Sequence, residues 1–442
     1  MTDISSPQIE QSFRVQSAVA HSELKMDTSG PLWGAFQSVD ASEINSINNT
    51  ITALETRSER DAAWEQIDHS AFIEAMYITS SVDDRTTILT NIARDADPET
   101  AAQFVATLSE SGHTIQGRDR LQEFSEIYAR HASPADRVAF IEELSPGMAE
   151  ADTFGGRLSS TTADKEALAA ATVLNSLSGS FAREAVGNLS PAELSAMTDA
   201  TIEIRRASAT GQARDHHDAS AFPAFANTIA LYGTTPQKAT VFDRAGDTLF
   251  RIQNKGWFHG SGADIAMPQI ANGMSKLIVS DANGVMDALF RELGAKDAAN
   301  GQALSAYTRQ LVDDGTPLPL ARIQAQLLGQ FDTHSPSFNA RFNTAEVRNG
   351  VEVYTNAETL GYFAGAVQNG VSLSHAGEAE KAAFAKEMVE LTTGIVGGAI
   401  AIPSAGWGLS VTVAGQAAGR GLEAYMTGER AEYDTLISGS SL

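Results

Sequence analysis

The chain has 442 residues and a formal net charge of −24, and these properties already exclude several classes of protein. At roughly 100 to 200 residues per domain, the chain should contain two or three domains, and its hydrophobic content of 43% is typical of globular proteins. An excess of 55 acidic over 31 basic residues repels the phosphates of nucleic acids and disfavours nucleic acid as a partner. Because cysteine is absent, disulfides, thiolate metal sites and cysteine nucleophiles are excluded.

Residues 1–39 are expected to form a flexible polar leader. They lack the basic region and apolar core of a Sec-type signal peptide. A cysteine-free chain with such a leader is typical of export through a narrow secretion machine, where a premature disulfide would block passage. Two locations therefore stay open: secretion by a specialised, non-Sec system, or the cytoplasm.

A helical domain is predicted over residues 40–240. Its first helix should follow Asp40, which begins a capping box with Glu43. Three windows of eighteen residues then align without gaps: 72–89, 124–141 and 225–242. Each begins with phenylalanine, has a pair of small residues in the middle and ends with a pair of apolar residues. A poorer copy of the pattern lies near residue 170. Each window predicts a helix, a tight capped corner and a second helix. Their spacing resembles the period of about fifty residues of helical solenoids, but an ordinary antiparallel helical bundle that reuses the same capping residues produces such windows too, and both interpretations stay open.

A second helical domain is predicted over residues 241–442. Asn349-Gly350 stands between two alternating runs and predicts a β-hairpin over residues 346–354. A lone hairpin is marginally stable, so it should lie on a helical body. The predicted fold is therefore mostly α-helical: a helical repeat or bundle, then a helical domain with one small β-hairpin and a C-terminal hairpin of helices rich in glycine and alanine over residues 391–425.

This C-terminal hairpin is predicted from an uncharged stretch, residues 391–419, which a helix from about Glu378 should enter directly. Pro403 divides the stretch into two arms of about twelve residues, or about 18 Å each as helix. That length is short of the roughly 30 Å of a bilayer core, so the arms should fold back on their own domain, with insertion into a membrane as the alternative. The residues expected to contact a membrane or a partner are Ile395, Ile400, Ile402, Pro403, Trp407, Leu409, Val411 and Val413.

Two groups of polar residues are weak candidates for chemistry. Asp215, His216, His217 and Asp218 are consecutive and combine ligands that bind divalent metals, but no partner motif accompanies them, and a solvated linker is the favoured interpretation. His259 and Ser261 lie in an aromatic, glycine-rich loop, residues 257–262, where histidine could act as a general base beside serine. The spacing of a nucleophile elbow is missing, so neither a cofactor nor a catalytic site is predicted with any specificity.

The segment from Asn356 to Val367, followed by the uncharged stretch, resembles the C-terminal region of large helical effector or toxin-like proteins of Gram-negative bacteria. The resemblance covers about residues 270–430, and its motifs are not specific. It implies export by a specialised secretion system and, for some such proteins, action on membranes. No catalytic residue can be carried over, because the matching positions are small or aromatic.

Three functions follow from these patterns. The first is an exported effector or toxin-like protein that acts by binding protein and, in one form of the hypothesis, by contacting a membrane through residues 391–425. The second is a soluble helical scaffold or adaptor, and the third is a hydrolase that uses the 257–262 loop. A protein partner is expected in the first two, and the oligomeric state is not predicted.

Overall fold

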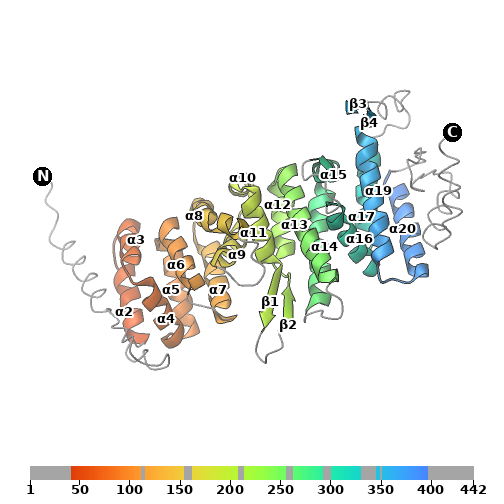
Figure 1. The fold of residues 1–442 in the computed structure, drawn as a ribbon. Coiled ribbons are helices and arrows are strands. Elements are labelled where there is room, and N and C mark those ends of the chain that lie inside the picture. Colours follow the sequence, from red (N-terminus) through yellow and green to blue (C-terminus); the bar gives the residue numbers. More distant parts are fainter. Residues whose placement is uncertain are drawn as a thin grey trace, which may run out of the picture. The chain divides into compact units, whose positions relative to one another are not determined.

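The chain is mostly α-helical, as predicted from the sequence (Figure 1). The structure is a computed structural model. It describes residues 41–110, 115–153, 162–207, 214–254, 262–291, 300–329, 345–348 and 351–396. The expected leader, residues 1–39, lies outside the described residues. The chain divides into two compact units, Met1–Ala200 and Thr201–Leu442, so the division falls earlier in the chain than the expected boundary at residues 240 and 241.

Unit 1, Met1–Ala200, is a stack of helices in two layers. Each helix packs against the helix two places along the chain: α2 on α4, α4 on α6, α6 on α8 and α8 on α10 in one layer, and α3 on α5, α5 on α7 and α7 on α9 in the other. The bounds are α2 Ala41–Thr52, α3 Arg57–Glu65, α4 His69–Thr79, α5 Val82–Asp95, α6 Pro98–Glu110, α7 Ile115–His131, α8 Pro134–Thr153, α9 Thr162–Leu174, α10 Gly179–Asn188 and α11 Pro191–Thr201.

The corners between helices of unit 1 lie where the sequence windows place them. Residues 80–81 separate α4 from α5, and residues 132–133 separate α7 from α8. At the second corner the Ser133 hydroxyl accepts a hydrogen bond from the Asp136 amide at 3.1 Å, as an N-cap residue does. The expected fifty-residue unit is wrong, however, because the first window begins in the layer of α4 and the second begins in the layer of α7. The windows have the same kinds of residue at the corner between two helices, but they do not occupy equivalent positions in a repeat.

A continuous line of buried aromatic rings joins the helices of unit 1. Ring centroids are 6.3 Å apart for Trp64 and Phe104, 6.3 Å for Phe104 and Phe124, 5.9 Å for Phe124 and Tyr128, and 4.5 Å for Tyr128 and Phe140. These residues come from α3, α6, α7 and α8, and each is at most 1% exposed. Offset and edge-on pairs at these separations add to the stability that burial of the rings provides. The core of unit 1 therefore runs through successive helix pairs without a break.

Unit 2, Thr201–Leu442, combines helices with two β-hairpins. The bounds are β1 Glu203–Ala207, β2 Arg214–Asp218, α12 Phe222–Tyr232, α13 Thr235–Asn254, α14 Ala263–Ser280, α15 Ala282–Arg291, α16 Asn300–Asp313, α17 Leu318–Gly329, β3 Ala345–Arg348, β4 Val351–Tyr354, α19 Thr355–Leu373 and α20 Glu378–Val396. Strands β1 and β2 pair antiparallel, and so do β3 and β4, where Arg348 faces Val351 across Asn349-Gly350. The second pair lies at the expected hairpin, and the first was not predicted.

Helix α16 lies at the centre of unit 2 and is approached closely by glycines of its neighbours. It packs against α13, α14 and α19. A Cβ atom added to Gly246 of α13 would overlap Ala303 of α16 and lie 2.5 Å from the Ala303 Cα. A Cβ atom added to Gly370 of α19 would lie 2.5 Å from the Ser305 carbonyl oxygen. Both crossings therefore bring backbones together at a distance that only glycine permits.

Candidate functional site

The loop that carries His259 and Ser261 lies outside the described residues. Helix α13 ends at Asn254, and the chain is described again from Gly262, which has φ of 88° and precedes α14. A positive φ of this size is readily adopted only by glycine. The hydrolase hypothesis for these two residues stays a prediction.

The Asp215–Asp218 sequence belongs to strand β2, so the interpretation as a solvated linker is wrong. In the register with β1, Arg206 faces Asp215, Arg205 faces His216 and Ile204 faces His217. One of the facing pairs, Arg206 with Asp215, combines opposite charges, whereas Glu203 faces the like-charged Asp218. The polar composition of these residues conceals the strand in the sequence. The Asp218 carboxylate accepts a hydrogen bond from the Ser220 amide at 2.9 Å. No group of three or more acidic or histidine side chains in the described residues could hold a metal ion.

The predicted helix from Glu378 into the uncharged stretch is confirmed as α20, which ends at Val396. Thr392 is buried, and its hydroxyl lies 3.0 Å from the Gln324 side chain of α17. Ile395 is 49% exposed. The remaining expected contact residues lie beyond α20 and outside the described residues: Ile400, Ile402, Pro403, Trp407, Leu409, Val411 and Val413. Within the described part of the chain, no helix combines the length and apolar character that crossing a membrane requires.

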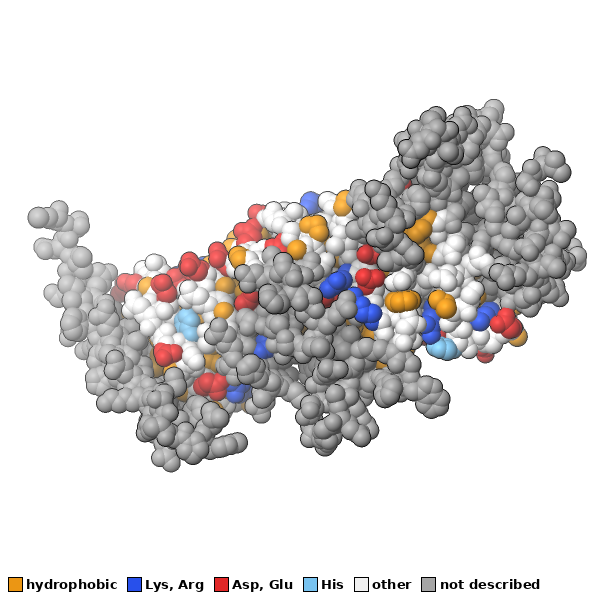
Figure 2. All heavy atoms as spheres, viewed as in Figure 1, with side chains coloured by type: hydrophobic (Ala, Val, Ile, Leu, Met, Phe, Trp, Pro, Cys, Tyr) orange, Lys and Arg blue, Asp and Glu red, His pale blue; other side chains and the backbone are white. Residues whose placement is uncertain are grey.

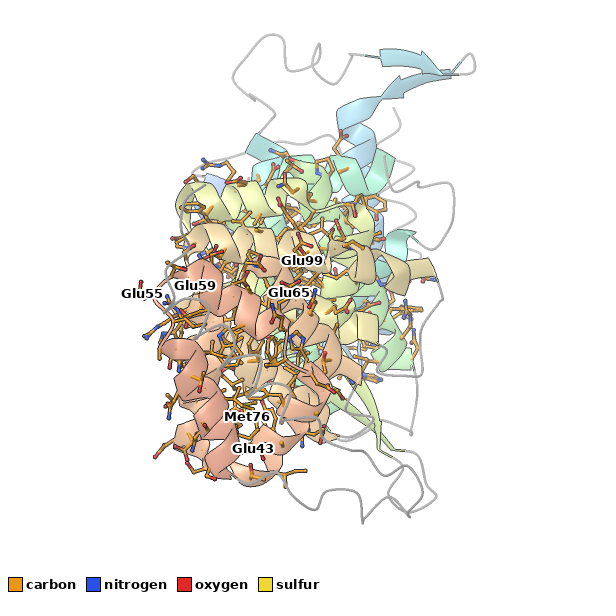
Figure 3. All side chains as sticks on the ribbon, turned by 90° about the vertical axis from the view of Figure 1, so that its left-hand side faces the viewer. Glu43, Glu55, Glu59, Glu65, Met76 and Glu99 are labelled. Atoms are coloured by element: carbon orange, nitrogen blue, oxygen red, sulfur yellow. The ribbon has the colours of Figure 1, made fainter. Side chains whose placement is uncertain are left out.

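Acidic side chains gather on α3, on α6 and at the corner before α3 in unit 1. Figure 2 shows them along the upper edge of this unit, and Figure 3 shows Glu55 beside Glu59 and Glu65 near Glu99. Helices α3 and α6 pack against each other, which brings Glu65 of the first and Glu99 of the second to one surface. Glu55, Glu65 and Glu99 are exposed, and Glu59 is half-buried. These four residues form what we call the acidic ridge.

Glu59 is fixed in the ridge by the start of α3. Its carboxylate accepts a hydrogen bond from the Thr56 amide at 3.0 Å, and the Thr56 hydroxyl accepts one from the Glu59 amide at 3.2 Å. This reciprocal pair is a capping box, and the hydrogen bond from the Thr56 amide lowers the pKa of Glu59. The carboxylate therefore stays charged at neutral pH. The Thr56 to Glu59 spacing is a signal from which the start of α3 could have been predicted.

The acidic ridge keeps its charge because nearby arginines are paired elsewhere. Residues 41–110 contain thirteen acids, four arginines and no lysine. Arg57 bonds Asp136 at 2.9 Å, Arg60 bonds Asp95 at 2.8 Å, and Arg85 bonds Glu123 at 3.1 Å. Among the described residues, Glu55, Glu65 and Glu99 form no ion pair. The ridge is thus a local excess of negative charge on α3, on α6 and at the corner before α3.

Arginines also tie the corners of unit 1 to one another. Arg57 donates to the Ala96 carbonyl at 3.0 Å, at the corner between α5 and α6. Arg137 donates to the Ala129 carbonyl at 2.9 Å and to the Ser176 carbonyl at 3.1 Å, which joins the α7–α8 corner to the α9–α10 corner. Each arginine contacts a residue 39 positions farther along the chain. These contacts hold successive helix pairs in register.

A second polar cluster lies in unit 2, where α16 meets the connection between α19 and α20. Arg309 is 6% exposed, and it donates to the Asn254 side chain at 3.3 Å and to Nε2 of His375 at 3.0 Å. Asp313 accepts a hydrogen bond from the His375 amide at 2.7 Å. Burial lowers the pKa of Arg309. Arg309 and His375 are 66 residues apart in the sequence, so no local pattern could have paired them.

Comparisons with known proteins provide no family for this chain. No protein-family model, no curated protein and no solved structure matches it.

Proposed function

We propose that the chain is a helical protein-binding scaffold, in which unit 1 binds a basic partner through the acidic ridge. The observation that carries the proposal is the ridge itself: Glu55, Glu65 and Glu99 are exposed, without an ion pair among the described residues, and Glu65 and Glu99 lie on helices that pack against each other. Both the effector hypothesis and the scaffold hypothesis contain this binding step. A partner rich in lysine or arginine would supply the charges that unit 1 lacks.

The two-layer arrangement supports the proposal for a second reason. Stacked helix pairs offer an extended surface whose side chains are held by neighbours on both sides, as in helical solenoids. A rigid surface loses little entropy on binding, because its side chains are already ordered. Complementary charge mainly raises the association rate and discriminates against acidic competitors. Its contribution to the affinity of the final complex is smaller.

The ridge can be tested with a lysine-rich amphipathic helical peptide and the full chain. We expect binding, measured by fluorescence anisotropy, to weaken by about tenfold when the salt concentration rises from about 50 to about 200 mM, because salt screens exposed charges. The double change Glu65→Gln and Glu99→Gln should weaken binding by about tenfold at low salt. A peptide of the same pattern with glutamate in place of lysine should not bind.

A matched control separates the ridge from the net charge of the chain. Glu387 and Glu390 are exposed on α20, and changing both to glutamine removes the same charge from unit 2. We expect the control variant to bind the lysine-rich peptide within about twofold of the unchanged chain. Equal weakening by the two double variants would refute a specific site on unit 1.

The membrane step is a second candidate function, and one observation favours it. Ile395 is 49% exposed near the end of α20, although Thr392, three residues earlier in the same helix, is buried against α17. If residues 391–425 contact a bilayer, Ile395→Asp should reduce co-flotation with anionic liposomes. The matched control is Ile78→Asp, at a 55% exposed isoleucine of unit 1, which should float unchanged. Flotation of Ile395→Asp equal to that of the unchanged chain would remove this candidate.

A further inference from the structure

Two apolar side chains are exposed together at one corner of unit 1. Ile78, in the last turn of α4, is 55% exposed, and Val82, the first residue of α5, is 64% exposed. A single apolar residue on a surface is ordinary, but these two flank the same tight turn, Ser80-Ser81. Among the described residues of unit 1, Phe181 is the only other large apolar side chain that is exposed, at 37%. We call Ile78 and Val82 the apolar corner.

Neighbouring side chains hold the apolar corner in place. The Ser81 hydroxyl accepts a hydrogen bond from the Asp84 amide at 3.1 Å and so caps α5. On the other side of the turn, the Tyr77 hydroxyl of α4 donates to the Glu123 carboxylate of α7 at 3.1 Å, and Arg85 of α5 pairs with the same carboxylate. The ends of α4 and α5 are therefore both attached to α7. A surface that is ordered in this way before binding loses little entropy when a partner docks.

The charge beside the apolar corner is negative. Asp83 is exposed and Asp84 is half-buried, and no ion pair joins either of them to another described residue. The cation that follows them in α5, Arg85, is already paired with Glu123. Both aspartates lie in the first turn of α5, where the positive end of the helix dipole offsets only about half a charge. The corner therefore combines apolar surface with a net negative charge.

Helix α4 connects the acidic ridge with the apolar corner. It begins four residues after Glu65 of the ridge. Ser70, Glu74 and Ile78 then follow at intervals of four residues, so they lie on one side of the helix, where Ser70 and Ile78 are exposed and Glu74 is half-buried. Figure 3 shows Met76, in the half of α4 that leads to the corner, below Glu65. The eleven residues of α4 are about 16 Å long, a length that a helical partner of about eleven residues covers.

We propose that the apolar corner binds the apolar side of the same partner whose basic side chains meet the acidic ridge. The inference rests on the proposed function and narrows the partner to a basic amphipathic segment of at least about eleven residues. A basic segment without apolar residues would leave Ile78 and Val82 uncovered, and an acidic segment is repelled by Asp83 and by the ridge. Burial of the two side chains supplies affinity that salt does not screen, whereas salt does screen the attraction of the ridge.

The double change Ile78→Ser and Val82→Ser in the full chain tests the proposal. We expect this variant to bind the lysine-rich amphipathic peptide about tenfold more weakly than the unchanged chain, by the same factor at about 50 and about 200 mM salt, as measured by fluorescence anisotropy. The matched control, Leu231→Ser and Ile265→Ser, removes two apolar side chains of unit 2 that are 66% and 67% exposed, and it should bind within about twofold. A peptide that keeps every lysine but has serine at its apolar positions should bind the corner variant and the unchanged chain equally.

The outcomes distinguish this inference from the proposed function. If the corner variant binds as tightly as the unchanged chain while the Glu65→Gln and Glu99→Gln variant binds more weakly, the apolar corner is not part of the site, and only this inference is overturned. Equal weakening by the unit 2 control would overturn it too, because the effect would not be local. If sedimentation velocity shows a dimer of the unchanged chain that the corner variant does not form, a second copy occupies the corner and the inference is again overturned. If neither double variant of unit 1 weakens binding, the proposed function itself fails.

Discussion

Gly246→Ala tests whether the close crossing of α13 and α16 sets the stability of unit 2. The added Cβ would lie 2.5 Å from the Ala303 Cα and 3.0 Å from its carbonyl carbon. These are backbone atoms of the facing helix, so no change of rotamer relieves the overlap, and the two helices must separate. Overpacking of this kind costs about 1–3 kcal/mol, and more where the backbone must move.

The same substitution also has a favourable effect, which must be subtracted. Alanine is about 1 kcal/mol better than glycine in a helix interior. Because the neighbour at this crossing is backbone, we take the steric cost from the upper end of its range, at about 3 kcal/mol. The net loss in the free energy of unfolding is then about 2 kcal/mol, which corresponds to a melting temperature lower by about 4–8 °C for a unit of this size.

Gly365→Ala is the matched control, in α19 of the same unit. Gly365 is exposed, and nothing lies within 4 Å of an added Cβ. We expect this variant to gain about 0.5–1 kcal/mol from helix propensity alone. Urea denaturation followed by circular dichroism measures the free energies, and hydrogen exchange of α13 and α16 locates the effect. If both glycine variants change stability in the same direction, the account of the crossing is refuted.

Three further predictions concern charge and capping. Burial and the nearby Asp247 raise the pKa of Asp243 to about 6. The folded chain therefore binds more protons than the unfolded chain between about pH 4 and pH 6, and stability falls as pH rises through this window. Asp243→Asn should raise the free energy of unfolding by on the order of 2 kcal/mol at about pH 7.5 and leave it unchanged near pH 4, as measured by urea denaturation; an equal gain at both pH values would contradict this. Arg137→Ala should lower the free energy of unfolding by about 1–3 kcal/mol, because it leaves the Ala129 and Ser176 carbonyls without their donor. The control Arg94→Ala, at an exposed site, should change this free energy by less than about 0.5 kcal/mol. Thermal unfolding of the two variants measures the difference. Ser133→Ala should lower the free energy of unfolding by about 1 kcal/mol, because the Asp136 amide loses its hydrogen-bond acceptor at the start of α8. An unchanged melting temperature would argue against this N-cap.

Local signals in the sequence predicted local structure well. The capped corner predicted in the window 124–141 lies at Ser133-Pro134, where α8 starts. The same pair of residue types, Ser190-Pro191, starts α11, and Glu193 closes a capping box with Ser190. These predictions hold because a cap is decided by a few adjacent residues. The hairpin of β1 and β2 was missed because strand Arg214–Asp218 has no alternation of apolar and polar residues, which is the usual signal of a strand.

Signals that depend on distant residues could not be found in one sequence. Tyr77 lies between Arg85 and Arg120, whose guanidinium carbons are 4.9 and 4.5 Å from its ring centroid, and it donates to Glu123 at 3.1 Å. Burial raises the pKa of Tyr77, with the Glu123 charge as a second cause. The residues of this cluster come from α4, α5 and α7, and only packing brings them together. The same holds for the acidic ridge, although the lack of lysine in residues 41–110 was a visible sign of it.

The most direct test of the central claim is a hydrogen-exchange footprint of the lysine-rich peptide on the full chain. We expect peptide-dependent protection of α3 and α6, which carry the acidic ridge, and no protection of α3 and α6 in the Glu65→Gln and Glu99→Gln double variant. Protection confined to unit 2, or protection of α3 and α6 that survives the double change, would contradict the claim that unit 1 binds a basic partner through these carboxylates.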